Sequence, residues 1–217
     1  PRMIMRFPWQ GCQTTLTTFT DSDWAGDRLE RRSTSGGVIR LGDHCIKMWS
    51  SIQKNIALSS GEAEYYGMAK GASQGMGLKA IAVDLGIAYE GPIQINTDAS
   101  AAIGMSSRLG LGKVRHIEVT QPWIQEKIYK KEILLKKVGT LENIADALTK
   151  PVSAETLKYH VDHSSAECRR DRHRLAPEVA KGEDEERSNI EDSSEQEPRL
   201  ESRATEEEGG EDWTEED

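Results

Sequence analysis

Four carboxylates in this chain are placed so that a folded domain could gather them into one metal site: Asp21, Glu64, Asp98 and Asp146. Carboxylates about 4 Å apart repel by about 4 kcal/mol per pair at an effective dielectric constant of about 20, so such a cluster requires cations. Hard oxygen ligands select Mg²⁺, with Mn²⁺ as the alternative. Two such ions about 4 Å apart would activate a water and stabilise the leaving oxygen of a phosphodiester. The four acids are therefore candidate metal ligands and candidate catalytic residues.

Each acid also has an ordinary structural explanation. Asp98 could be the N-cap of a following helix, and Asp21 could be a turn residue. Glu64 and Asp146 could be solvated positions on helices. For any one acid alone the ordinary explanation is favoured, because perturbed acids also occur in structural networks. The metal-site hypothesis therefore depends on the elements that would bring all four together.

The first part of the chain predicts three antiparallel strands. Residues 13–24, QTTLTTFTDSDW, alternate around Leu16 and Phe19 and are rich in Thr, as in a half-buried strand that ends in acidic residues. Residues 36–51 contain two apolar alternating runs, separated by the turn formers Gly42 and Asp43. This second pattern is typical of a hairpin.

A long helix is predicted to follow the hairpin. Ser59 and Glu62 have the spacing of a capping box, and apolar residues then recur at intervals of three and four. Gly67, Gly71 and Gly75 each weaken a helix by about 1 kcal/mol relative to Ala. Their spacing of four places them in one row, which predicts a face where the helix lies close to the sheet.

The second part of the chain predicts alternating strands and helices. The expected elements are a strand at 92–98, a short helix at 98–107, a helix at 116–131 interrupted near Pro122, a strand at 132–138 and a terminal helix that begins near Thr140. Together with the first part, this order predicts an α/β fold in which helices pack on the faces of a mixed sheet. In this layout the four acids lie at or next to element ends on one edge of the sheet.

The charge of the chain changes sharply after about residue 150. Residues 1–150 carry 19 Lys and Arg against 15 Asp and Glu, a net charge of +4, whereas residues 151–217 carry 9 against 22, a net charge of −13. The total of −9 therefore belongs to the tail, and the mildly basic first part remains compatible with a polyanionic partner. From about Ala176 almost no apolar residues remain, which predicts disorder.

Cysteine usage and hydropathy exclude several other classes. Cys12, Cys45 and Cys168 are odd in number, far apart and without a C-x-x-C pair, so neither a disulfide framework nor a thiolate zinc site is predicted. No apolar run approaches the roughly 20 residues of a membrane span. We therefore expect an intracellular protein without a membrane partner, with cytoplasm and nucleus both left open.

Six strings carry a resemblance to a known family: TDSDWAGD, RRSTSGG, ALSSGEAEYYGMAKG, INTDASAA, KVRHIEV and NIADALTKP. In order and approximate spacing they resemble the ribonuclease H domain of copia-type LTR retrotransposon Pol polyproteins, over nearly all of residues 14–160. The resemblance implies a five-stranded mixed sheet flanked by helices, with endonuclease activity on the RNA strand of RNA–DNA hybrids. We also expect residues 1–13 to be the remnant of a connection to a reverse transcriptase domain, and residues 161–217 to be an acidic, mostly disordered tail.

The resemblance assigns the four acids position by position. The first family Asp falls on Asp21 rather than Asp23, because Asp21 directly follows the strand in the T-D pair, and the family Glu falls on Glu64 rather than Glu62. The other two are Asp98 in N-T-D and Asp146 in I-A-D. The sequence departs from cellular ribonucleases H at 136–143, which lack the His thought to aid product release, and this implies a slower enzyme.

Substrate contacts are predicted at basic residues in loops or at element ends: Arg31, Arg32, Lys54, Lys113 and Arg115. Trp24 and Trp49 could stack on nucleic acid, although a strand tryptophan such as Trp49 is more often part of a core. His116 could contact phosphate or form a buried hydrogen bond at a helix start. A further pattern, His160, His163, Cys168 and His173, has the intervals of a retroviral-type zinc knuckle but different ligand types, and the ordinary end of a helix is the favoured explanation.

Three functions of different classes follow from these observations. The first is an active nuclease for RNA–DNA hybrids that contains two Mg²⁺ ions. The second is an inert ribonuclease H-like module that only binds or scaffolds nucleic acid. The third is an interaction protein that acts through its acidic tail. The presence of all four acids favours the first over the second.

Overall fold

A five-stranded sheet forms the centre of the molecule in the computed structural model, which describes residues 2–87, 89, 91–108 and 120–169. Its strands lie in the order β4-β3-β2-β5-β6. Neighbours are antiparallel from β4 to β2 and parallel from β2 to β6, so the predicted mixed sheet is confirmed. The strands are β2 (Leu16–Ser22), β3 (Thr34–Leu41), β4 (His44–Ile52), β5 (Ile93–Thr97) and β6 (Ile133–Lys137).

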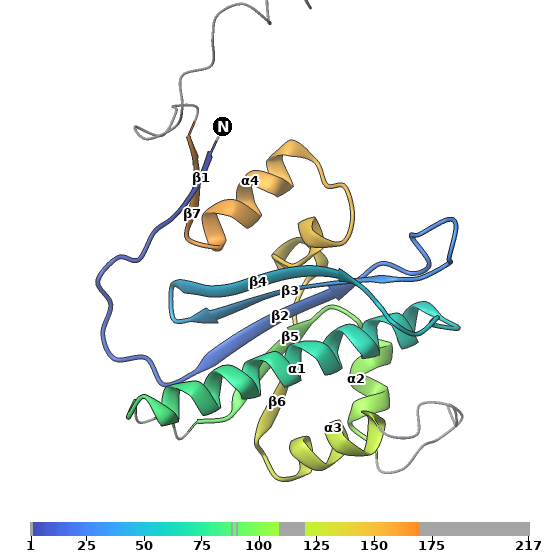
Figure 1. The fold of residues 1–217 in the computed structure, drawn as a ribbon, viewed down its shortest axis with the longest axis horizontal. Coiled ribbons are helices and arrows are strands. Elements are labelled where there is room, and N and C mark those ends of the chain that lie inside the picture. The colour runs from blue at the N-terminus through green and yellow to red at the C-terminus, as the bar shows by residue number, and fades with distance from the viewer. Residues whose placement is uncertain (1, 88, 90, 109–119, 170–217) are drawn as a thin grey trace, which may run out of the picture. The chain divides into compact units, whose positions relative to one another are not determined.

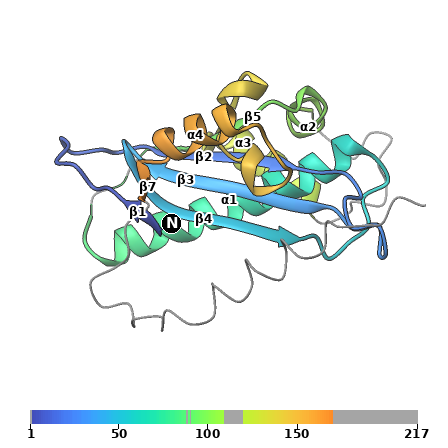
Figure 2. The same cartoon turned by 90° about the horizontal axis from the view of Figure 1, so that it is seen from above.

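Helices cover both faces of this sheet, as Figure 1 and Figure 2 show. The long helix α1 lies on one face, and the last helix α4 lies on the other side in Figure 1. This is the five-stranded sheet with flanking helices that the sequence resemblance implies. The helices are α1 (Ser60–Asp84), α2 (Ser100–Ser106), α3 (Thr120–Tyr129) and α4 (Ala154–His163), with short 3₁₀ turns η1 (Thr140–Glu142) and η2 (Asp146–Leu148) before α4.

Helix α1 lies close to the sheet along its row of glycines, as predicted. A Cβ atom on Gly71 would come within 2.4 Å of Thr20 Cγ2, and one on Gly67 within 2.3 Å of Ser22 Oγ. Only glycine allows the helix backbone to approach β2 this closely. The largest apolar core then forms between α1, α2, α3 and the strands β5 and β6, around Tyr65, Met68, Ile93, Ile95, Ile124 and Ile133.

Replacing Gly71 with Ala should destabilise the protein, even though Ala is the better helix former. The added methyl group overlaps Thr20, and overpacking of this kind costs about 1 to 3 kcal/mol, against a helix-propensity gain of about 1 kcal/mol. Gly77→Ala is the matched control on the same helix, because a Cβ there has no atom within 4 Å. We expect chemical denaturation to show a net loss of up to about 2 kcal/mol in the free energy of unfolding for Gly71→Ala and a gain for Gly77→Ala. Equal effects at both positions would contradict the close approach.

The opposite face of the sheet packs under the 3₁₀ segment and α4. Val38, Cys45 and Ile144 are buried there, with Phe19, Met48 and Leu148 packed against them. A separate two-stranded sheet lies beside α4, in which β1 (Arg2–Met5) pairs antiparallel with β7 (Ala166–Arg169). The first and last described segments of the chain are therefore neighbours in space (Figure 1).

The terminal helix predicted from Thr140 is wrong, because the chain forms two 3₁₀ turns there and α4 begins only at Ala154. Asn143 explains the break. Its side-chain amide donates to the Thr20 carbonyl at 3.0 Å, and its Oδ1 accepts from the Ala145 backbone N–H at 3.3 Å. These bonds anchor the segment to β2 in a turn that a regular α-helix would not allow.

The interruption predicted near Pro122 is also absent from α3. The helix begins at Thr120, so Pro122 lies in its first turn, where the missing N–H has no helical partner to lose. The predicted residues 116–119 lie outside the described part of the chain, as do residues 170–217 of the predicted tail. Residues 161–169, which the prediction also places in that tail, instead contain the end of α4 and the strand β7. Among the described helices, none is both long enough and apolar enough to cross a membrane.

Candidate metal centre

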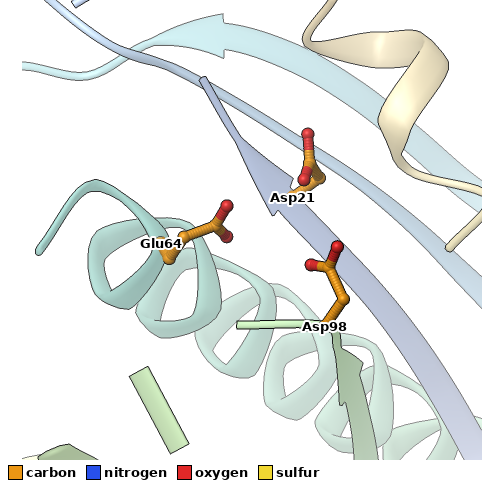
Figure 3. A group of neighbouring side chains, drawn as sticks. All are labelled: Asp21, Glu64 and Asp98. Carbon is orange, nitrogen blue, oxygen red and sulfur yellow. The ribbon is translucent and has the colours of Figure 1, made fainter. Parts of the chain in front are cut away.

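Three of the four predicted acids converge at one edge of the sheet. Asp21 lies near the end of β2, Asp98 directly follows β5, and Glu64 lies early in α1. Because β2 and β5 are parallel neighbours, their carboxyl ends meet at the same edge, and α1 begins beside them. Each residue offers one carboxylate oxygen, and these three oxygens lie within 4.8 Å of one another. Figure 3 shows the three side chains around a shared space.

Two threonines hold the aspartates in place. Thr140 Oγ1 donates to Asp98 Oδ2 at 2.9 Å, and Thr149 Oγ1 donates to Asp21 Oδ2. Both threonines come from the 3₁₀ segment that Asn143 anchors to β2. Asp21 is only 1% exposed, so its orientation is also fixed by packing. The segment after β6 therefore orients the carboxylates that β2 and β5 supply.

Glu64 has an unusual protonation equilibrium. Burial raises the pKa of its carboxyl, and the nearby charges of Asp21 and Asp98 raise it further, to about 8. A hydrogen bond from the Ser22 backbone and the charge of Lys150 oppose this shift without cancelling it. The Oε2 atom of Glu64 is buried and has no hydrogen-bond partner among the described residues. Without a cation, this side chain is therefore largely protonated at neutral pH.

Asp146 lies beside Asp21 but outside the group of three. It is 4% exposed, and its buried Oδ1 has no hydrogen-bond partner among the described residues. Burial and the charge of Asp21 raise its pKa to about 6, although its other oxygen lies 3.0 Å from Lys150 Nζ. The structure thus brings the fourth predicted acid to the same edge of the sheet, next to Asp21.

Lys150 is the charged neighbour that the sequence prediction missed. Its Nζ atom lies 3.0 Å from Asp146 Oδ2 and 3.7 Å from Asp21 Oδ1. Burial alone would lower the pKa of Lys150, but the hydrogen bond to Asp146 and the charges of Asp21 and Asp146 outweigh burial and raise it. The one signal in the sequence is its position four residues after Asp146, the spacing of a helical ion pair.

The two acids next to the predicted ligands have structural roles. Glu62 Oε2 accepts from the Leu58 backbone N–H at 2.9 Å, while the Glu62 N–H donates to the N-cap Ser59 Oγ at 3.2 Å. Asp23 Oδ1 accepts from the Thr34 backbone N–H and holds the start of β3. Both carboxylates thus accept backbone hydrogen bonds, and neither belongs to the group of three.

The donor set fits a divalent hard cation. Asp21, Glu64 and Asp98 each offer a carboxylate oxygen, the kind of ligand that Mg²⁺, Mn²⁺ and Ca²⁺ prefer. Two buried carboxylate oxygens, Glu64 Oε2 and Asp146 Oδ1, have no hydrogen-bond partner among the described residues. A buried unpaired carboxylate is costly, and a bound cation would remove that cost.

The predicted nucleic-acid contacts are only partly described. Arg31 is exposed with a left-handed φ of 57°, Arg32 pairs with Glu30 at 3.0 Å, and Lys54 is exposed beyond the end of β4. Lys113, Arg115 and His116 lie outside the described residues.

The two tryptophans considered for stacking have different environments. Trp49 packs against the small core of Leu16, Ile39 and Tyr89, in line with the core explanation favoured for a strand tryptophan. Trp24 is 55% exposed, and its indole N–H donates to the Ala57 carbonyl at 3.1 Å. Of these two tryptophans, Trp24 is therefore the one with an exposed aromatic surface.

The His and Cys pattern near residue 160 does not form a described metal cluster. His160 is buried in α4, whereas His163 is exposed and stacks on Tyr159 with ring centroids 3.7 Å apart. Cys168 is exposed on β7, and His173 lies outside the described residues. Among the residues that the structure describes, these side chains are not gathered as Asp21, Glu64 and Asp98 are.

Sequence comparison finds retrotransposon polyproteins. The chain is 31% identical over 145 residues to the retrovirus-related Pol polyprotein from transposon RE1 of Arabidopsis thaliana. The aligned region covers 66% of this chain and 10% of that protein. It is 32% identical over 143 residues to the corresponding polyprotein from transposon TNT 1-94 of Nicotiana tabacum, with 65% and 11% covered. The chain thus spans about a tenth of the length of these curated relatives. The predicted resemblance to retrotransposon Pol polyproteins is confirmed.

Comparison with family models and with solved structures gives two further findings. No protein-family model matches the chain. Among solved structures, the N-terminal ribonuclease H domain of a Mycobacterium tuberculosis protein is 16% identical, with a TM-score of 0.45 and coverage of 69% of this chain and 97% of that domain.

Proposed function

We propose that this chain hydrolyses the RNA strand of RNA–DNA hybrids as an endonuclease, in the reverse transcription of a copia-type retrotransposon. The observation that carries the proposal is the convergence of Asp21, Glu64 and Asp98 at one edge of the sheet, with their oxygens within 4.8 Å. The similarity to retrotransposon Pol polyproteins supports the same function, because reverse transcription makes an RNA–DNA hybrid from which the RNA must be removed.

Each residue of the centre has a distinct part in the proposed reaction. Two divalent ions, Mg²⁺ or Mn²⁺, supply an activated water and stabilise the leaving oxygen of the phosphodiester when they are bound. Asp21, Glu64, Asp98 and Asp146 would hold these ions through carboxylate oxygens. Thr149 orients Asp21 and Thr140 orients Asp98, so the ligands are positioned before the substrate arrives. Lys150 balances the negative charge of Asp21 and Asp146.

The proposed substrate and partner follow from the charge of the domain. A net charge of +4 on residues 1–150 favours a polyanion, with Arg31, Arg32 and Lys54 among the described residues, and Lys113 and Arg115 outside them, as phosphate contacts. We expect the chain to act together with a reverse transcriptase domain of a longer polyprotein.

The test is cleavage of an end-labelled RNA–DNA hybrid by the purified chain. With Mg²⁺ or Mn²⁺ we expect internal cuts in the RNA strand only, none after addition of EDTA, and none in an all-DNA duplex of the same sequence. Asp98→Asn, purified in parallel, excludes a contaminating nuclease. Tight binding of the hybrid without cleavage by the wild-type chain, under conditions where a known ribonuclease H is active, would instead establish an inert binding module.

A further inference from the structure

An apolar cavity of about 200 Å³ lies on the side of the sheet opposite α1, away from the glycine row. Its lining residues come from β1, β3, β4, the segment around η2, α4 and β7. Met3 and Leu157 are among its lining residues and are 57% and 47% exposed, so the cavity opens to solvent beside them. The inner wall is aliphatic, and its members include Val38, Met48, Ile144, Leu148, Val161 and Ala166.

One buried polar ring interrupts this apolar wall. His160 lines the cavity from α4 and is 3% exposed. Neither Nδ1 nor Nε2 has a hydrogen-bond partner among the described residues. Buried polar side chains in folded proteins are almost always hydrogen-bonded, so two unpaired nitrogens on one buried ring require an explanation.

The state of this ring fits a hydrogen bond to a neutral ligand. Burial lowers the pKa of His160, and the charges of His163 and Lys150 lower it further against a weaker opposing effect of Asp21. The imidazole is therefore neutral at pH 7, with one nitrogen as a donor and the other as an acceptor. A water molecule alone is a poor occupant, because a buried water makes two to four hydrogen bonds and this lining is apolar apart from His160 and Ser164.

We infer that this cavity binds a single-ring aromatic molecule that carries one hydroxyl group, with the ring against the aliphatic wall and the hydroxyl bonded to His160. Size supports this class of ligand, since an apolar protein cavity of about 150 Å³ holds benzene. The hydroxyl distinguishes the ligand from benzene, because it supplies a hydrogen-bond partner for one of the two unpaired nitrogens of His160. None of the four acids of the carboxylate centre lines this cavity, and the inference does not depend on the proposed nuclease function.

Phenol and benzene are the probes for this inference, and both are titrated into the full chain while histidine ring and methyl resonances are followed by NMR. We expect saturable shifts of the His160 ring and of Val38, Ile144 and Val161 methyl groups with phenol, and weaker binding of benzene. His160→Phe keeps a ring and removes both nitrogens. This substitution should lower the affinity for phenol at least about fivefold and leave the affinity for benzene unchanged, as expected for the loss of one hydrogen bond. His163→Phe, on the exposed side of the same helix, is the matched control.

Either of two results would overturn the inference. Absence of saturable shifts with either probe would mean that the cavity does not admit a ring. Equal affinity of the wild-type chain for phenol and benzene would mean that His160 does not bond the hydroxyl. This last comparison uses the wild-type chain alone, so it decides the matter even if His160→Phe does not fold.

Discussion

Asp98→Asn should lower the rate of hybrid cleavage about 100-fold to 1000-fold, which corresponds to the loss of about 2.7 to 4 kcal/mol of transition-state stabilisation. The substitution removes one negative charge and one carboxylate oxygen from the group of three, while the amide oxygen can still accept from Thr140. The fold should therefore survive. Single-turnover cleavage at saturating enzyme measures the rate, and calorimetric titration with Mg²⁺ should show weaker binding in the same variant.

Asp84→Asn is the matched control for this substitution. It makes the same chemical change on an exposed residue at the far end of α1, 20 residues after Glu64, which is about 30 Å along the helix. Its cleavage rate and Mg²⁺ affinity should equal those of the wild-type chain. If Asp98→Asn also retained more than half of the wild-type rate, Asp98 would not be a ligand of the reactive ions and the proposed centre would be wrong.

The metal-free protein should lose stability as the pH rises from about 4.5 to about 8. The pKa of Glu64 is about 8 in the folded state and about 4.5 in the unfolded chain, so within this window the folded state binds one more proton at this residue. Unfolding then releases a proton, and the free energy of unfolding falls by up to about 1.4 kcal/mol per pH unit from this residue. Asp146, with a pKa raised to about 6, adds a smaller loss of stability in the lower part of this pH range.

Urea denaturation in EDTA at several pH values measures this slope. Glu64→Gln should flatten it, because the neutral amide stands in for the protonated carboxyl. Saturating Mg²⁺ should displace the proton and raise the stability of the wild-type chain near pH 8, by about 2.7 kcal/mol at 100 times the dissociation constant. A wild-type slope that is identical to that of Glu64→Gln would show that Glu64 ionises normally in the folded protein.

Local pattern was sufficient to predict most of the fold. Alternation around Leu16 and Phe19 gives β2, and the glycine row at Gly67, Gly71 and Gly75 correctly indicated where α1 approaches the sheet. The 3₁₀ segment could not be predicted in this way. Its conformation depends on a hydrogen bond from Asn143 to Thr20, which is 123 residues away in the chain, and its sequence alone has a helical pattern.

The acidic residues of the candidate site could be predicted from the sequence, but the residues that surround them could not. Asp21, Glu64 and Asp98 stand at ends of elements that the sequence marks clearly, so their convergence followed from the topology. The roles of Thr140, Thr149 and Lys150 depend on how the 3₁₀ segment folds back onto β2. The β1–β7 pair was likewise not predicted, since each strand has only four residues and the pairing joins segments more than 160 residues apart.

The pairing of β1 with β7 determines how the protein would respond to mechanical tension. Arg2 lies opposite Arg169 and Met5 opposite Ala166, so the outer ends of both strands are at the same end of the ladder. A force applied to the chain before β1 and after β7 would unzip this pair, breaking its backbone hydrogen bonds one after another instead of shearing them all together. The β1–β7 pair should separate at low force, before any load reaches β2 and β5. A longer polypeptide could therefore be stretched at both flanks while the carboxylate centre keeps its geometry.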